Sequence, residues 1–292
     1  MVILFFAHGA KEFLNEVIFA VLSYYQHHRV GEHKVVIYTD NEVYLRQWLP
    51  EEVTYVAVDA DLMKMWRGTQ DYLHRAKIKV IQDAIDRYPK EYIIFIDSDT
   101  YFKDNISSLK NKIDEGYAIM HFKEKPFKEA KEHHTIVAYL ELHHHIIETE
   151  TLKIKVDKNQ FMGNSGVIGL PPGAGALVEN VLRVNDLLYP ELKLIFTEQL
   201  AFTLVLAAQY PIYEAKLLIC HYWYFKAFRG VINTFLQENE GKSFEELVRL
   251  SAAYNPERMG SEKLAYKQMN FWQKLYYKIK NRGQKSVISG QL

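Results

Sequence analysis

The sequence predicts an α/β protein whose mainly parallel sheet is covered by helices on both faces. Three observations lead to this fold class. Through residues 1–100, short apolar runs alternate with segments whose apolar residues recur at helical spacing. The strongest run, Tyr92-Ile93-Ile94-Phe95-Ile96, is apolar throughout, as a strand buried on both faces requires. Polar residues follow the runs, and open α/β sheets bind ligands where their strands end.

Each element can be assigned in chain order. Apolar runs predict strands at residues 2–7, 35–38, 53–58, 92–96, 161–170 and 212–219. Helical spacing predicts helices at residues 17–25, 76–84, 177–188 and 198–208, and Thr197 is the expected N-cap of the last. The polar, histidine-rich segment 123–158 is expected to be an insertion or lid. We therefore expect one α/β domain at residues 1–232 that carries the functional site, followed by a helical extension at residues 233–292.

The composition excludes several classes of protein. The 292 residues include 36 Lys and Arg against 36 Asp and Glu, a balance that argues against a nucleic-acid-binding protein. Cys220 is the one cysteine, which excludes an intrachain disulfide or a cysteine-ligated zinc site and favours a reducing compartment. No apolar run reaches the roughly 18 residues that a membrane-spanning helix needs. We therefore expect a cytoplasmic globular protein.

Two carboxylates follow the strongest predicted strand. Asp97 and Asp99 flank Ser98, and the alternation of a strand points both acids to the same side. Two negative charges at such a short distance repel one another, which costs free energy unless a cation lies between them. Mg²⁺ and Mn²⁺ prefer oxygen ligands, and they bind through one or two carboxylates plus phosphate oxygens of the substrate. The motif therefore predicts a divalent-metal site, although two such acids can also cap a strand and begin a turn.

Phosphatases of the haloacid dehalogenase type also carry an acidic motif after a hydrophobic strand. In that class Asp97 would be the nucleophile that forms an aspartyl-phosphate. The chemistry needs further acids downstream to hold Mg²⁺, but the only aspartates after Asp114 are Asp157 and Asp186, and neither lies in an acidic pair. The acidic strand also normally comes first in such a domain, whereas three predicted strands precede it here. The phosphatase is kept as an alternative hypothesis.

A second class of enzyme matches more of the chain. The segment from Arg75-Ala76-Lys77 to Asp97-Ser98-Asp99 resembles family 8 glycosyltransferases, the galactosyltransferase and glycogenin group. Three later segments resemble further motifs of that family in the same order, namely Asn164-Ser165-Gly166-Val167, Thr197-Glu198-Gln199, and His221-Tyr222 with Lys226-Ala227-Phe228. The resemblance covers residues 75–228, about half of the chain. It implies a Rossmann-like A-type glycosyltransferase fold and the transfer of a sugar from a nucleotide sugar.

The resemblance also implies roles for individual residues. His221 would be the third metal ligand beside the two acids, and its nitrogen favours Mn²⁺ over Mg²⁺. Lys226 and Arg75, or Lys77 in place of Arg75, would neutralise the departing diphosphate. Apart from the resemblance, strand-end geometry predicts that the nucleotide pocket is reached by the residues that end the first two strands, namely Ala7, His8, Thr39 and Asp40. Ser98, inside the acidic motif, is expected to face the nucleotide as well.

At the sugar end, Gln199 would lie beneath the anomeric carbon and Asn164 would orient the donor sugar through its amide. A carboxamide is a poor nucleophile, so we expect retention by a same-face displacement rather than through a covalent glycosyl-enzyme. Glu198 either binds a sugar hydroxyl or is an acid favoured by the dipole at the start of a helix. The expected reaction is metal-dependent transfer from a UDP-sugar to a glycan or lipid-linked acceptor. A non-catalytic peripheral membrane protein that binds a nucleotide sugar or glycan is a further alternative.

The carboxyl-terminal segment is basic and amphipathic. Residues 261–292 contain seven Lys or Arg and one Glu. Large apolar side chains share one helical face there, namely Trp272, Leu275, Tyr276 and Ile279. This combination is typical of a helix that lies in an anionic membrane interface, so we expect the segment 264–285 to bind the inner face of the membrane. A terminal helix docked on the domain is the alternative.

Overall fold

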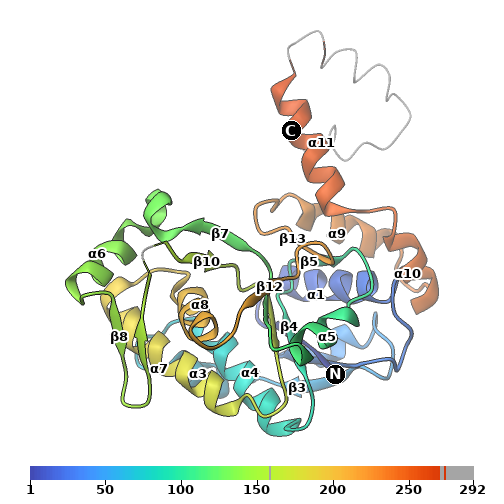
Figure 1. Cartoon of the computed structure of the whole chain (residues 1–292). Coiled ribbons are helices and arrows are strands. Elements are labelled where there is room, and N and C mark those ends of the chain that lie inside the picture. Colours follow the sequence, from blue (N-terminus) through green and yellow to red (C-terminus); the bar gives the residue numbers. More distant parts are fainter. Residues whose placement is uncertain (158, 270–272, 274–292) are drawn as a thin grey trace.

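The computed structural model describes residues 1–157, 159–269 and 273 of the chain (Figure 1). These residues form a central sheet of seven strands in the order β12-β6-β11-β4-β1-β2-β3. In that order the strands are Ile212–Glu214, Ala118–Met120, Val167–Leu170, Ile93–Ile96, Val2–Ala7, Lys34–Thr39 and Thr54–Ala57. β11 runs antiparallel to β4 and β6, whereas the other neighbouring strands are parallel. The sheet is mainly parallel, which confirms the predicted fold class.

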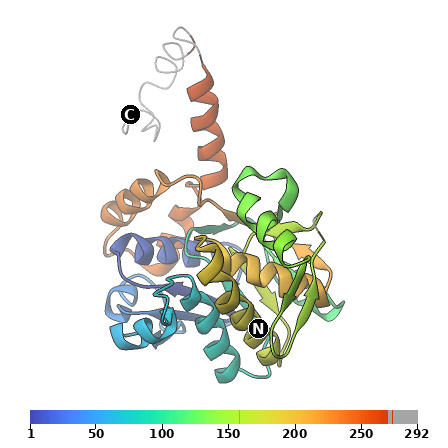
Figure 2. The ribbon, with the colours of Figure 1, turned by 90° about the vertical axis from the view of Figure 1, so that its left-hand side faces the viewer.

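Helices pack on both faces of the sheet (Figures 1 and 2). One hydrophobic core includes α3 (Ala60–Arg67), α4 (Arg75–Arg87), α7 (Gly175–Leu192) and α8 (Thr197–Gln209). The other includes α1 (Lys11–Tyr24), α2 (Glu42–Leu45), α5 (Ser108–Asp114), α9 (Phe228–Glu238) and α10 (Phe244–Ser251). In β4, Ile93 and Phe95 belong to the first core, while Ile94 and Ile96 belong to the second. Burial on both faces explains why this strand is apolar at every position.

Three short ribbons lie beside the central sheet. β5 (Thr100–Phe102) pairs with β13 (Ile219–His221), β7 (Lys123–Pro126) with β10 (Phe161–Gly163), and β8 (Ile146–Glu148) with β9 (Lys153–Lys155). The single strand expected at residues 212–219 is therefore two strands in different sheets. The chain turns after β12, where the N–H of Leu218 donates to the carbonyl of Ala215 (2.9 Å). As a result, β13 runs antiparallel to β5 and brings His221 opposite Thr100, directly after the acidic motif.

The segment expected to be an insertion packs as part of the domain. It contains β7, α6 (His134–Leu142), β8, β9 and the short 3₁₀ turns Phe127–Glu129 and Lys131–His133. Its apolar side chains are buried in the same core as α7 and α8, and they include Phe127, Ile136, Leu140, Ile147 and Ile154.

One expected helix boundary shifts in the structure. α8 begins at Thr197 and its N-cap is Phe196, so the N-cap prediction is wrong by one residue. The hydroxyl of Thr197 instead donates to the carbonyl of Leu194 (2.8 Å). The expected division between residues 232 and 233 falls inside α9, which packs in one core with α1. The last described helix, α11 (Pro256–Gln268), extends away from the rest of the chain (Figures 1 and 2).

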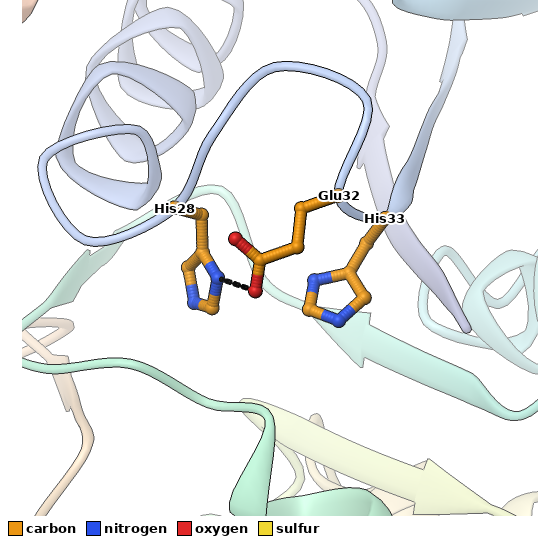
Figure 3. A group of neighbouring side chains, drawn as sticks. All are labelled: His28, Glu32 and His33. Atoms are coloured by element: carbon orange, nitrogen blue, oxygen red, sulfur yellow. Dashed lines mark hydrogen bonds and ion pairs between the residues drawn. The ribbon is translucent and has the colours of Figure 1, made fainter.

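His28 links the loop after α1 to the segment after β5 through a hydrogen bond. Figure 3 shows its ring beside the side chains of Glu32 and His33. The N–H of Ile106 donates to His28 Nε2 (3.1 Å), so the ring proton is on Nδ1, which donates to Glu32 Oε1 (2.9 Å). His33 lies close enough to complete a group that could hold a metal ion. A metal on Nδ1 would require the proton on Nε2, where it would meet the N–H of Ile106. The group is therefore a hydrogen-bonded clamp rather than a metal site.

His28→Leu is expected to lower the free energy of unfolding by about 1–3 kcal/mol, because it leaves the buried N–H of Ile106 unpaired. Burial lowers the pKa of His28 from its ordinary value of 6.5. The folded wild-type protein therefore loses stability as the pH falls below that value, and its advantage over the variant narrows. Urea denaturation near neutral and at mildly acidic pH measures both effects. His27→Leu is the control, and an equal loss of stability in the two variants would contradict the clamp.

Candidate active site

A pocket of about 450 Å³ opens where β1 and β4 end. Most of the predicted site residues line it, namely Ala7, His8, Lys77, Asp97, Ser98, Asp99, Glu198, Gln199, His221 and Lys226. These residues come from β1, α4, α8, the segment after β4 and the segment around β13. The pocket thus lies at the edge where open α/β sheets bind their ligands.

Three of the lining residues form a group that could hold a metal ion. Asp97 and Asp99 follow β4, and the pairing of β13 with β5 brings His221 beside them. His221 Nε2 lies 3.0 Å from Asp99 Oδ1 and 3.8 Å from Asp97 Oδ2. One ligand atom from each residue lies within 4.8 Å of the other two. Carboxylate oxygens with one imidazole nitrogen suit a divalent ion such as Mn²⁺.

Asn164 fixes the orientation of the His221 ring. Asn164 Oδ1 accepts a hydrogen bond from the N–H of Gly166 (3.0 Å), which identifies this end of the amide as the oxygen. His221 Nδ1, 2.9 Å from the same atom, therefore donates to it, and Nε2 faces the two acids. A hydrogen bond of this kind is usual behind a metal-binding histidine. Gly166 leaves room for the ring, since an added Cβ would lie 2.2 Å from His221 Nδ1.

Lys77 joins two acids at the base of the pocket. Its Nζ lies 3.0 Å from Asp97 Oδ1, 3.0 Å from Glu198 Oε1 and 3.2 Å from Ser165 Oγ. Burial alone would lower the pKa of Lys77, but the carboxylates of Asp97 and Glu198 raise it above its ordinary value, so the ammonium stays charged. Glu198 lies in the first turn of α8 and lines the pocket. It forms an ion pair with Lys77, although its Oε1 makes no hydrogen bond.

Asp99 is ionised despite its burial. Burial would raise the pKa of this carboxyl, but the hydrogen bond and charge of His221, together with the charge of Lys226, hold the pKa well below its ordinary value. Lys226 Nζ lies 3.5 Å from Asp99 Oδ2, while the Lys226 side chain is 59% exposed. Asp99 therefore presents ionised oxygens, which is the form that binds a metal cation.

The amides of Gln199 and Asn164 share a partner that sequence reasoning missed. Gln199 Oε1 accepts from the N–H of Ser165 (3.3 Å), and its Nε2 donates to Glu124 Oε1 (3.3 Å). Asn164 Nδ2 donates to the same oxygen of Glu124 (3.0 Å). Gln199 lines the pocket, whereas Asn164 is 4% exposed and lies behind His221. The expected contact of Asn164 with the donor sugar stays a prediction.

Arg75 lies away from this pocket. Its guanidinium donates to Asp186 through Nε (2.7 Å) and Nη2 (2.8 Å), and to the carbonyl of Trp66 through Nη1 (2.8 Å). Arg75 and Asp186 line a separate cavity of about 290 Å³. Arg75 and Lys77 are the two cations of α4 that were expected near the diphosphate. Lys77 reaches the acidic motif, and Arg75 does not.

Thr39 and Asp40 lie beside the loop after β1. Thr39 is buried, and its Oγ1 accepts from the N–H of Asn41 (3.1 Å). Asp40 Oδ2 accepts from the N–H of Gly9 (3.0 Å) and lies 3.8 Å from His8 Nε2. Asp40 therefore holds the loop that carries His8, and contact of Thr39 or Asp40 with a nucleotide stays a prediction.

Other lining residues belong to no predicted motif. Arg229 donates through Nε and Nη2 to the two carboxylate oxygens of Glu16 (2.8 and 3.1 Å), and its guanidinium lies 5.1 Å from the centre of the Phe13 ring. Trp223, 50% exposed, lines the same pocket. Arg229 follows Lys226 closely in the sequence, and this second basic residue could have been noticed as a candidate for the same site. No sequence motif pointed to Glu16, which lies among the apolar residues of α1.

Comparison with known proteins shows the fold. No protein-family model matches the chain, and no curated protein sequence matches it. The solved structure of the glycosyltransferase GlyE from Streptococcus pneumoniae TIGR4 matches with 13% identity and a TM-score of 0.52, over 86% of this chain and 63% of that chain. The chain has the A-type glycosyltransferase fold. This confirms the predicted architecture, while membership of family 8 stays a prediction.

Two further solved structures match at lower TM-scores. The galactosyltransferase LgtC matches with 11% identity and a TM-score of 0.49, over 70% of each chain. Mouse xyloside xylosyltransferase 1 matches with 18% identity and a TM-score of 0.46, over 73% of this chain and 85% of that chain.

In the part of the chain that the structure describes, no helix has the length and apolar character needed to cross a membrane. Most of the basic segment 264–285 lies outside the described residues. Its binding to a membrane surface stays a prediction.

Gly166→Ala is expected to weaken Mn²⁺ binding by about tenfold or more, because the added Cβ would displace the His221 ring from the two acids. Isothermal titration calorimetry with Mn²⁺ measures the affinity. Gly175→Ala is the control, because the atom nearest to its added Cβ lies 4.0 Å away. If Gly166→Ala bound Mn²⁺ as tightly as the wild-type protein, His221 would not be a ligand.

Proposed function

We propose that this protein is a metal-dependent glycosyltransferase that moves a sugar from a nucleotide sugar, with UDP as the nucleotide, to a glycan or lipid-linked acceptor. The observation that carries the proposal is the convergence of Asp97, Asp99 and His221 in a pocket at the ligand-binding edge of an A-type glycosyltransferase fold. The ordered motifs at residues 75–228 support UDP as the nucleotide. A divalent ion, Mn²⁺ by preference, would be held by these three side chains and would supply positive charge to the donor's phosphates.

Two cations of the chain complete the surroundings of the departing diphosphate. Lys226 is mostly exposed and lies 3.5 Å from Asp99, so its ammonium can contact a phosphate while it remains beside the acid. Arg229 lines the same pocket and is oriented by its two hydrogen bonds to Glu16. The leaving oxygens gain negative charge in the transition state, so preorganised cations stabilise that state more than the bound donor.

At the sugar end, neither Gln199 nor Glu198 is a free nucleophile. The carboxamide of Gln199 is weakly nucleophilic, and its oxygen already accepts the N–H of Ser165. Glu198 is 3% exposed, and its Oε1 lies 3.0 Å from the ammonium of Lys77. These contacts disfavour a covalent glycosyl-enzyme. They support retention by a displacement in which the acceptor hydroxyl attacks from the face that the diphosphate leaves.

Exposed apolar side chains line part of the pocket, which supports an acceptor with an apolar face. Large side chains line it and keep 37%, 51%, 71% and 50% of their surface exposed, namely Phe13, Leu73, Ile195 and Trp223 in that order. Exposed apolar groups gathered at one place usually mark a binding surface. For a lipid-linked acceptor, the basic segment 264–285 would bring the enzyme to the inner face of the membrane, in keeping with a cytoplasmic location.

Asp99→Asn tests the proposal. A panel of UDP-sugars and GDP-sugars is assayed for transfer and for hydrolysis with Mn²⁺, with Mg²⁺ and with a chelator. The wild-type protein is expected to require the divalent ion. The variant is expected to lose about 100-fold or more in kcat/KM, because the metal would lose an anionic ligand. Asp104→Asn makes the same chemical change at an exposed residue after β5 and is the control.

Several results would contradict the proposal. Full activity of Asp99→Asn, or wild-type activity in the chelator, would exclude a catalytic metal at this site. An acid-labile phosphate on Asp97 would favour the phosphatase alternative. Donor binding without transfer or hydrolysis would favour a binding protein. The anomeric configuration of the product, measured by NMR, checks the expected retention.

A further inference from the structure

One carboxylate oxygen holds together the side-chain amides of Gln199, which lines the pocket, and Asn164, which lies behind His221. Glu124 Oε1 accepts a hydrogen bond from Asn164 Nδ2 at 3.0 Å and another from Gln199 Nε2 at 3.3 Å. Glu124 lies on β7, in the segment 123–158, and belongs to no sequence motif. The two amides reach it from different elements, one after β10 and the other in the first turn of α8.

Main-chain hydrogen bonds set the position of Glu124 relative to Asn164. β7 pairs antiparallel with β10. Where the pairing ends, the N–H of Asn164 donates to the carbonyl of Phe122 (2.8 Å), and the N–H of His121 donates to the carbonyl of Asn164 (3.0 Å). The contact between Glu124 and the Asn164 amide is therefore supported by a paired backbone rather than by side chains alone.

A carboxylate can only accept hydrogen bonds, so both amides must turn their NH₂ groups toward Glu124. Their oxygens then face the other way. Asn164 Oδ1 faces His221 Nδ1 (2.9 Å), and Gln199 Oε1 faces the N–H of Ser165 (3.3 Å). An amide side chain can turn over with little change in shape, so its direction is decided by such partners.

The direction of the Asn164 amide decides which nitrogen of His221 is available to bind a metal ion. With the amide oxygen toward the ring, Nδ1 keeps its proton, and Nε2, which faces Asp99, is the nitrogen at which a metal ion would replace a proton. With the amide turned over, its NH₂ group would face Nδ1, and the ring proton would move to Nε2, where a metal ion would need the lone pair. The N–H of Gly166 holds the oxygen end of this amide (3.0 Å), and Glu124 holds the nitrogen end.

We propose that Glu124 is a positioning residue that orients Asn164 and Gln199 together and, through Asn164, keeps His221 in the tautomer that binds metal. The inference rests on the proposed metal-dependent transfer. Because Glu124 belongs to β7, the segment 123–158 would take part in building the metal site.

Isothermal titration calorimetry with Mn²⁺ alone tests the inference without an activity assay. Glu124→Ala is expected to weaken Mn²⁺ binding about tenfold, as the loss of an outer partner of a metal-binding histidine usually does. Glu124→Gln keeps an oxygen that can accept both hydrogen bonds, so its affinity is expected to stay within about threefold of the wild-type value. Glu129→Ala removes the same charge from an exposed residue of the same segment and should leave the affinity unchanged.

A double variant separates this path from a general loss of structure. In an Asn164→Ala background, adding Glu124→Ala is expected to change Mn²⁺ affinity by less than about twofold, because the path to His221 is already absent. In steady-state assays Glu124→Ala should lower kcat more than it raises KM for the donor, because Gln199 also loses its partner. Thermal unfolding of each variant shows that it is folded.

Equal Mn²⁺ affinity in the wild-type protein and Glu124→Ala would overturn this inference and leave the proposed metal site standing. Equal losses in Glu124→Gln and Glu124→Ala would also overturn it, because charge rather than hydrogen bonding would then be the cause. Failure of the wild-type protein to bind Mn²⁺ would overturn the proposed metal site, and this inference with it.

Discussion

The rest of the site depends on one electrostatic constraint, the closeness of two carboxylates at the end of a buried strand. Asp97 and Asp99 follow β4, whose side chains are buried on both faces of the sheet. Like charges in such a place repel one another and lose hydration, so positive groups must surround them. Lys77 approaches from α4, Lys226 from the connection between β13 and α9, and His221 from β13 itself. Separate parts of the chain thus meet at one acidic motif.

The strand next to β4 gives this meeting its geometry. β11 pairs with β4, and just before β11 the carbonyl of Gly166 accepts the N–H of Asp97 (2.9 Å). The same glycine leaves space for the His221 ring, and its N–H holds the amide of Asn164. A side chain at this position would collide with the His221 ring, which contacts both Asp99 and the amide of Asn164. The glycine is therefore required by close approach rather than by an unusual backbone conformation.

Local features of the fold could be predicted from the sequence, whereas pairings between distant elements could not. The strands β1, β2 and β4 are recognisable because strands buried on both faces need apolar side chains along their length. Arg75 and Lys77 show the limit. Residues two apart on a helix do not face each other, so one of them could reach the acids, but only the packing of α4 decides that it is Lys77. Glu124 and Glu16 gave no local signal, because their partners lie far away in the sequence.

The charge of the pocket governs the order in which ligands can enter. Three carboxylates face two ammonium groups there, namely Asp97, Asp99 and Glu198 with Lys77 and Lys226. His221 lies beside the same acids, and the ion pair of Glu16 and Arg229 is balanced, so the basic side chains are already matched by carboxylates and leave no excess positive charge for a diphosphate. A divalent cation supplies that excess, and the donor is then attracted to the same place. The equal numbers of acidic and basic residues in the whole chain therefore conceal a site that favours metal binding before, or together with, the donor.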